Sequence, residues 1–185
     1  MNNIVPEIDV LIASAIWLWK QRKVIPLQFS LAKGKGINLK SDEKRLRDEL
    51  KAAGVPDTSN IRKELRISSP SQFLLSSGQD IKGIGFSPQE IWQIECKGAG
   101  SGKKSTQRNN FDRALASVVC YYTDDFQGFK TYLGLALPAT SDYMSELRHR
   151  VGKPLRRQLN LWILLYNPNT KMICFVAPDG DYDNK

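Results

Sequence analysis

The chain has 185 residues, of which 41% are hydrophobic and 25% are charged. This length is typical of one domain, and this composition argues against extensive disorder because it supplies enough apolar surface for a core. The three cysteines form no CxxC pair, and His149 is the single histidine. These counts exclude a disulfide framework, a cysteine-based zinc site and any mechanism that needs two histidines.

The charge balance is strongly basic, with 27 Lys and Arg against 19 Asp and Glu, which gives a formal net charge of +8. A small basic domain favours polyanionic partners, of which nucleic acid is the first to consider. The longest apolar run, residues 10–19, is too short to cross a bilayer, and it follows acidic residues rather than a basic leader. We therefore expect no membrane partner and a cytoplasmic protein.

The first third of the chain has the period of helices rather than strands. The pattern predicts a buried helix over 7–22, a basic loop over 30–40, a helix over 41–53 with Ser41 as its N-cap, and a short helix over 58–66. We interpret residues 1–57 as an N-terminal helical extension, either separate from the rest or part of the same domain.

After residue 70 the hydrophobic period changes to two. The expected elements are strands over 72–76, 80–86 and 91–97, a helix over 106–122, a strand over 131–137, a basic helix over 141–158, and a hairpin of 161–166 with 171–177. This order predicts an α/β (α+β) domain over 58–185, with a mixed central sheet flanked by helices.

Two acid-x-Lys tripeptides lie on neighbouring predicted strands, at Asp80–Lys82 and Glu95–Lys97. Such tripeptides also arise by chance, so the secondary structure around each one must show whether its side chains can form a site. On a helix, residues two apart diverge by about 200°, whereas on a strand they share one face. Glu95 and Lys97 should therefore point the same way.

The turn between these strands decides where Asp80 lies. A type I turn over 87–90 places Asp80 opposite Lys97 and diagonal to Glu95, whereas a slip of two residues places it directly opposite Glu95. Both registers put the three side chains on one face, which we expect to open on a cleft or on solvent.

This charged set suits phosphodiester hydrolysis. Two neighbouring carboxylates repel each other, and a hard divalent cation such as Mg²⁺ relieves that repulsion. The cation polarises a phosphate and activates a water, while an ammonium two residues away stabilises the developing charge. The alternative is a solvated strand face on which Lys97 forms a salt bridge of little energetic value.

Asp80, the short hairpin and the run Ile94–Gly98 together resemble the PD-(D/E)xK nuclease superfamily. The resemblance implies a restriction-endonuclease-like core of a helix, three strands, a helix and a strand over about 58–137. It also implies hydrolysis of DNA with Mg²⁺ (or Mn²⁺). Many such enzymes cut as dimers, which makes a homodimer a candidate assembly.

The resemblance also implies roles for individual residues. Asp80, Glu95 and the backbone carbonyl of Cys96 would bind the metal, and Lys97 would be the catalytic lysine. One departure is that Gln79 stands where the family has proline.

Two further residues fit positions at which members of the family carry polar side chains. Gln107, or less well Arg113, corresponds to a polar residue at the start of the next helix. Glu64 corresponds to an additional acid on the helix before the first strand.

The glycine- and lysine-rich loop after Lys97 is not a nucleotide-binding loop. Lys97 stands where a P-loop needs its first glycine, and Lys104 stands where it needs Ser or Thr, so we expect no nucleotide cofactor. We interpret the surrounding cations as contacts to a nucleic-acid backbone, with a solvated flexible loop as the alternative. The predicted contacts are Lys82, Lys103, Lys104, Arg108 and Arg113.

Two other segments have both a DNA-binding and a plain structural interpretation. Residues 41–66 could form a helix-turn-helix or a simple two-helix packing unit. The basic residues of 148–157 could face DNA or only solvent.

The sequence is compatible with three functions. The leading one is a Mg²⁺-dependent DNA endonuclease. The others are a catalytically silent DNA-binding protein with the same fold that uses 41–66, and an assembly protein with an incidental basic surface.

Overall fold

The computed structural model describes residues 4–31, 38–56, 79–87, 89–102, 104–122 and 128–182. Within them six strands form one mixed sheet in the order β1-β2-β3-β4-β5-β6. The strands are β1 (Val24–Phe29), β2 (Ile81–Gly85), β3 (Glu90–Cys96), β4 (Lys130–Pro138), β5 (Leu161–Asn167) and β6 (Met172–Val176). The helices are α1 (Glu7–Lys20), α2 (Leu39–Ala52), α5 (Lys104–Cys120), α6 (Ser141–Arg150) and α7 (Lys153–Gln158).

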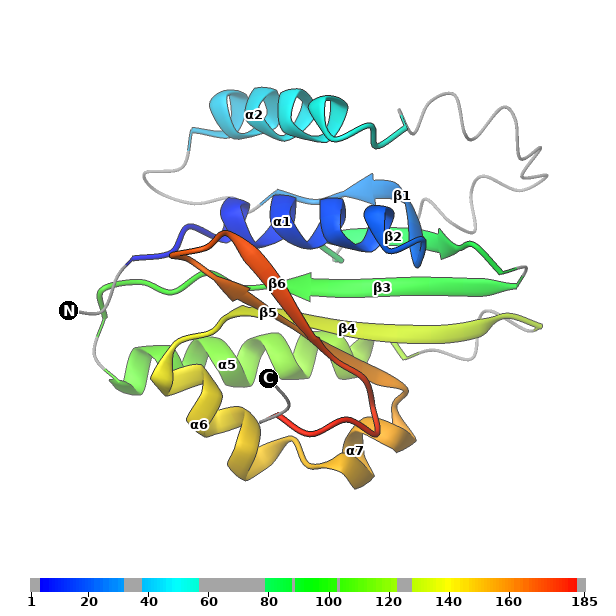
Figure 1. Ribbon diagram of the computed structural model, residues 1–185. Coiled ribbons are helices and arrows are strands. Elements are labelled where there is room, and N and C mark those ends of the chain that lie inside the picture. The colour runs from blue at the N-terminus through cyan, green and yellow to red at the C-terminus, as the bar shows by residue number, and fades with distance from the viewer. Residues whose placement is uncertain are drawn as a thin grey trace.

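The sheet is antiparallel at both edges and parallel in the middle. β1, β2 and β3 alternate in direction, β3, β4 and β5 run parallel, and β6 turns back on β5. Parallel neighbours need crossover connections, which α5 provides between β3 and β4, and α6 with α7 between β4 and β5. The sheet curls as β5 and β6 rotate away from the central strands (Figure 1).

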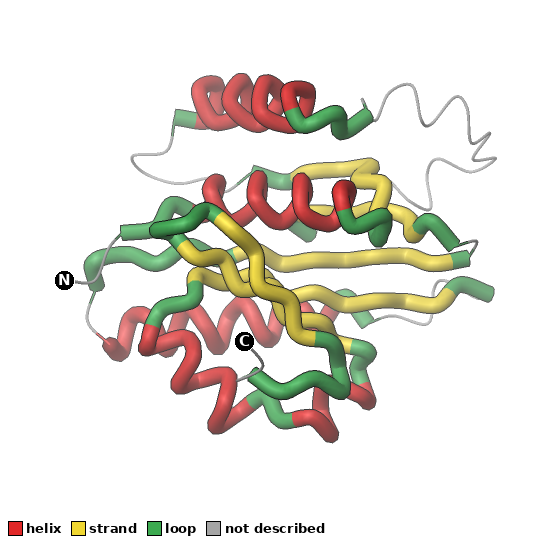
Figure 2. The backbone as a smooth tube through the Cα atoms, in the orientation of Figure 1, coloured by secondary structure: helices red, strands yellow, loops and turns green. Residues whose placement is uncertain are grey.

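Helices cover both faces of this sheet (Figure 2). α1 packs on the face of Trp92, because Trp17 contacts Phe175 and an aromatic row continues from there through Trp162 to Trp92. α5 packs on the opposite face, where Gln93 donates a hydrogen bond to the carbonyl of Tyr121. α2 lies outside α1, away from the sheet (Figures 1 and 2).

The predicted mixed sheet flanked by helices is confirmed, and most of its elements lie within a few residues of their predicted bounds. β5 and β6 form the predicted terminal hairpin, but β5 extends one residue further than expected, so that Asn167 lies opposite Met172. Among the described helices, none has both the length and the apolar character needed to cross a membrane.

One strand was missed, and the expectation of a purely helical segment before residue 58 is wrong. β1 pairs with β2, with Val24 opposite Gly85. α1 belongs to the same core, since Val10 and Leu18 are fully buried. Pro26 concealed β1 in the sequence, because proline donates no ladder hydrogen bond and is tolerated only at a sheet edge, where β1 lies.

Two helix boundaries also differ from their predictions. Asn38, not Ser41, caps α2, because its side chain accepts a hydrogen bond from the backbone N–H of Ser41. The single basic helix expected over 141–158 is divided into α6 and α7, because Pro154 lies in the first turn of α7 and cannot continue a preceding helix. The predicted helix over 58–66 and strand over 72–76 lie outside the described residues.

Candidate functional site

The hairpin of β2 and β3 brings Asp80 next to Glu95. Ile81 pairs with Ile94, so the same register continued by one residue places Asp80 opposite Glu95. This is the slipped register, and the one with Asp80 opposite Lys97 is wrong. The difference arises in the connection, where Gln89 adopts a left-handed backbone conformation with φ of 65° that the expected type I turn lacks.

Asp80 lies just before β2 and is held by the backbone of β3. Its Oδ2 accepts a hydrogen bond of 2.7 Å from the N–H of Cys96. In an antiparallel ladder a residue directs its N–H and C=O toward the same neighbour, so the Cys96 carbonyl also faces the Asp80 side. Asp80 Oδ1 and the Cys96 carbonyl are thus two oxygen ligands available on one side of β3.

Glu95 is fixed from the opposite layer by Tyr121, which directly follows α5. The Tyr121 hydroxyl donates to Glu95 Oε2 at 2.5 Å. Both carboxyl groups are largely removed from water, with Asp80 and Glu95 each 8% exposed. The two carboxyl groups are therefore not open to bulk solvent, and on the Glu95 side Tyr121 covers them.

Lys97 follows the end of β3 and forms an ion pair with the first residue of α1. Its Nζ lies 2.8 Å from Glu7 Oε2. The start of α1 is brought there by a short antiparallel bridge between Val5 and Ala99. Glu7 is thereby a third carboxylate at the end of β3.

The electrostatics of this cluster disfavour the negative charges of its two buried carboxyl groups. Burial, then repulsion from Glu95, raises the pKa of Asp80 to about 8, although the Cys96 N–H opposes the shift. Burial also raises the pKa of Glu95, against the hydrogen bond from Tyr121. Burial alone would lower the pKa of Lys97, but the hydrogen bond and charge of Glu7 raise it above its usual value. At neutral pH the cluster therefore favours an added positive charge.

Lys82 does not fit its predicted role as a phosphate contact. It lies on β2 on the face covered by α5, its side chain is 2% exposed, and burial lowers its pKa. A strand residue two places after Asp80 shares its face, so the layer that buries Asp80 buries Lys82 as well.

Gln107 lies near the start of α5 but binds the loop after Lys97 rather than the carboxylates. Its Nε2 donates to the Gly100 carbonyl at 2.6 Å, and its Oε1 is buried with no hydrogen-bond partner among the described residues. Of the predicted catalytic residues, the structure thus brings Asp80, Glu95 and Lys97 into one cluster. It places Gln107 beside the adjoining loop.

The predicted nucleic-acid contacts on α5 are exposed but do not form a single ridge. Lys104 and Arg108 are one helical turn apart, and neither pairs with an acidic side chain of the described part of the chain. Arg113 is also exposed, but nine residues after Lys104 it points about 180° away on a regular helix. Lys103 and Glu64 lie outside the described residues, as does most of the second half of the suggested helix-turn-helix.

The basic segment 148–157 is largely neutralised by the chain itself. Arg150 pairs with Asp112 and Glu146, and Lys153 and Arg157 pair with Asp181 and Asp179. Arg156 is buried and donates to two backbone carbonyls near the C-terminus. This segment therefore offers less free positive charge than its sequence suggests.

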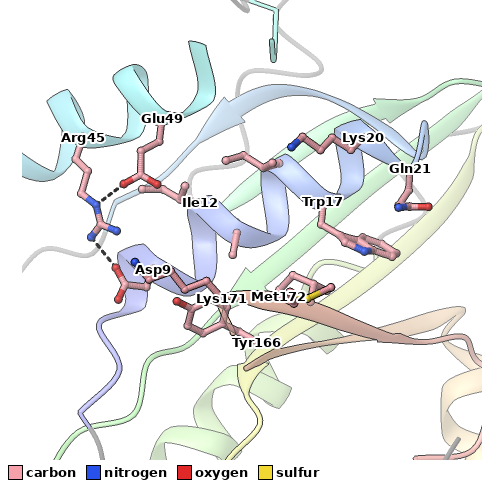
Figure 3. Close-up of a pocket in the computed structure, with 13 residues that line it drawn as sticks. Asp9, Ile12, Trp17, Lys20, Gln21, Arg45, Glu49, Tyr166, Lys171 and Met172 are labelled. Atoms are coloured by element: carbon pink, nitrogen blue, oxygen red, sulfur yellow. Dashed lines mark hydrogen bonds and ion pairs between the residues drawn. The ribbon is translucent and has the colours of Figure 1, made fainter. Parts of the chain in front are cut away.

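A separate hollow of about 470 Å³ lies between α1, α2 and the turn joining β5 and β6 (Figure 3). Trp17 and Ile12 contribute apolar wall, and Arg45 crosses its rim to bond both Asp9 and Glu49. None of the charged cluster at Asp80, Glu95 and Lys97 lines it.

Sequence reasoning missed Glu7 and Tyr121. Both reach the cluster through long-range contacts, and neither belongs to a short motif. The detectable signal was Gln93, a polar residue between the apolar Trp92 and Ile94 and on the face of Glu95, which indicates a buried polar partner on that side.

Within the described residues, no three His, Cys, Asp or Glu side chains come together in an arrangement that could hold a metal ion. The two adjacent carboxylates and the Cys96 carbonyl are nevertheless oxygen ligands of the kind that Mg²⁺ prefers, and Mg²⁺ needs few of them from a protein. No protein-family model matches the chain, and a search of curated proteins finds no match either.

Proposed function

We propose that this protein is a metal-dependent endonuclease that hydrolyses DNA phosphodiester bonds, with Mg²⁺ (or Mn²⁺) held between Asp80 and Glu95. The observation that carries the proposal is the buried pair of carboxyl groups at the ends of β2 and β3, with Lys97 beside it. Two neighbouring buried acids destabilise a fold, and a bound cation would offset that destabilisation.

The order of elements supports a restriction-endonuclease-like fold. α1, β1, β2, β3, α5 and β4 follow one another as a helix, three strands, a helix and a strand. In this arrangement the core would begin at α1 and not at residue 58, and 31–78 would be an insertion between β1 and β2. Glu7 would then take the place of the additional acid that Glu64 was expected to provide.

Each residue of the cluster has a definite task in this proposal. Asp80 Oδ1, Glu95 Oε1 and the Cys96 carbonyl would hold the cation, which supplies Lewis-acid polarisation of the phosphate and an activated water. Lys97 would stabilise the negative charge that develops on the phosphate oxygens. Glu7 binds the ammonium of Lys97 and keeps it charged, and the charges of Glu95 and Asp80 favour the same charged form.

The test is nicking of supercoiled plasmid by the wild type in Mg²⁺, by the wild type in EDTA, and by Lys97→Ala in Mg²⁺. We expect Mg²⁺-dependent nicking that falls at least about a hundredfold in Lys97→Ala, since one electrostatic group of this kind contributes about that factor. Lys51→Ala, which removes an exposed lysine from α2, is the matched control and should cut like the wild type.

Full activity in Lys97→Ala would contradict the site. No cutting, together with a salt-sensitive shift of DNA in a gel, would favour the catalytically silent DNA-binding protein instead. Neither cutting nor DNA binding would favour an assembly protein.

A further inference from the structure

A chain of hydrogen bonds lies behind the carboxylate pair and connects its two sides. Gln79 Nε2 donates to Gln93 Oε1 at 2.6 Å, and Gln93 Nε2 donates to the Tyr121 carbonyl at 2.8 Å. The Tyr121 hydroxyl then donates to Glu95 Oε2. The chain begins at the residue next to Asp80 and ends on Glu95.

The direction of this chain is fixed by the chemistry of its members. The Tyr121 carbonyl can only accept, so Gln93 must present its NH₂ group to it. The Gln93 oxygen then faces the other way and accepts from the NH₂ of Gln79. Reversing either amide would bring two acceptors or two donors together in a buried place.

The side chains of Gln79 and Gln93 are buried in the protein interior. Gln79 is 4% exposed and Gln93 is 1% exposed. Gln93 lies in the interior of β3, where apolar residues are usual, and either amide buried without partners would destabilise the protein. Gln79 also occupies the position at which the resembled nucleases have proline, which could not take part in such a chain.

We propose that Gln79, Gln93 and Tyr121 are positioning residues that hold Glu95 with Oε2 engaged and Oε1 free for the cation. The inference rests on the proposed function only in assigning a cation to this site. Gln93 fixes the backbone at the end of α5, Tyr121 reaches from there to Glu95, and the carboxylate is held in one orientation before the cation arrives. The chain thereby sets the affinity of the site and not the chemistry of the phosphate.

The test is Mn²⁺ binding, measured by calorimetry at one pH on the full-length protein. Tyr121→Phe keeps the ring and removes the hydroxyl, and we expect Mn²⁺ affinity to fall about tenfold, the lower end of the loss usual for residues that orient metal ligands. Tyr122→Phe is the matched control, since Tyr122 is the next residue and is 52% exposed, and it should bind within about twofold of the wild type.

Gln93→Met tests whether the chain acts as one unit. On its own it should also weaken Mn²⁺ binding, but in the Tyr121→Phe background it should add little, because the link to Glu95 is already broken. A purely structural role would lower the denaturation midpoint of both variants without changing Mn²⁺ affinity, and that result would overturn the inference.

The two proposals fail in different ways. A wild type that binds Mn²⁺ tenfold more tightly than Tyr121→Phe but never cuts DNA would support the positioning role of the chain. The same result would overturn the proposed nuclease function. A wild type that cuts DNA, with unchanged Mn²⁺ affinity in Tyr121→Phe, would overturn the positioning chain alone. A wild type that binds no Mn²⁺ would overturn both.

Discussion

Asp80 is placed where its charge destabilises the folded protein. Its carboxyl group is 8% exposed and lies next to Glu95, and these two causes raise its pKa to about 8. The single backbone hydrogen bond from Cys96 only partly compensates. A residue kept at such a position without a structural benefit is typical of functional sites, where stability is given up for chemistry.

The sign of this effect on stability follows from proton linkage. The folded protein holds the Asp80 proton up to about pH 8, whereas the unfolded chain releases it near its ordinary pKa of 3.8. Between these values the folded state binds more protons, so the contribution of Asp80 to the free energy of unfolding falls as pH rises. This contribution is fully present below pH 4 and is lost by pH 8.

Asp80→Asn should therefore stabilise the metal-free protein at pH 8 and leave its stability nearly unchanged at pH 4. The amide oxygen can still accept the Cys96 hydrogen bond, while the buried charge is gone. We expect a gain of about 1–3 kcal/mol in the free energy of unfolding at pH 8, measured by denaturant titration in EDTA.

Asp48→Asn, at an exposed carboxylate on α2, serves as the control for a change in charge alone and should show no such pH-dependent gain. If Asp80→Asn were as stable as the wild type, or less stable, at pH 8, the carboxyl group would not be destabilising there.

At the scale of the elements, β1 depends on a glycine in the neighbouring strand. A Cβ built on Gly83 would lie 2.4 Å from Val24 Cγ1 and 2.5 Å from the Ile25 carbonyl oxygen. The backbone of β1 cannot move away from such a Cβ without losing its hydrogen bonds to β2. Gly83 therefore permits the close approach of the edge strand that sequence analysis missed.

Gly83→Ala should destabilise the protein by about 1–3 kcal/mol, the usual range for forcing extra atoms into a packed site. Denaturant titration measures this loss. Gly100→Ala adds the same methyl group where the nearest atom is 3.9 Å away, and it should be nearly neutral. Equal stability of the two variants would mean that β1 does not pack on β2 as described.

The elements also show what the sequence could and could not predict. The proximity of Glu95 and Lys97 could be predicted, because the side-chain period of a strand is local, and the two groups do interact electrostatically. The register of Asp80 was left open, because it depends on the left-handed conformation of Gln89, which no glycine or asparagine marks. Glu7 and Tyr121 were missed because their contacts with Lys97 and Glu95 join residues far apart in the chain.

At the scale of the whole molecule, the net charge of +8 overstates the positive surface available to a polyanion. Arg150, Lys153 and Arg157 are paired with acidic side chains, and Arg156 is buried. The charge of the C-terminal third is therefore largely balanced within the fold. Among the residues that the structure describes, Lys104 and Arg108 at the start of α5 are exposed cations that follow the proposed catalytic cluster closely in the sequence.

This difference in pairing gives a prediction about DNA binding. In a Lys97→Ala background, which prevents cutting, Lys104→Gln/Arg108→Gln should reduce the slope of log K against log salt by about two, because two phosphate contacts are lost. The measurement is fluorescence anisotropy of a labelled duplex between about 50 and 200 mM NaCl, the range over which phosphate contacts change affinity most visibly.

The matched control for that experiment is Lys153→Gln/Arg157→Gln in the same background. Both double substitutions remove two positive charges, but this pair is neutralised by Asp181 and Asp179 before any DNA arrives. The control should change the slope of log K against log salt by less than half of the change that Lys104→Gln/Arg108→Gln produces. Equal slopes in the two variants would mean that DNA responds to net charge alone, and the start of α5 would then have no special part in binding.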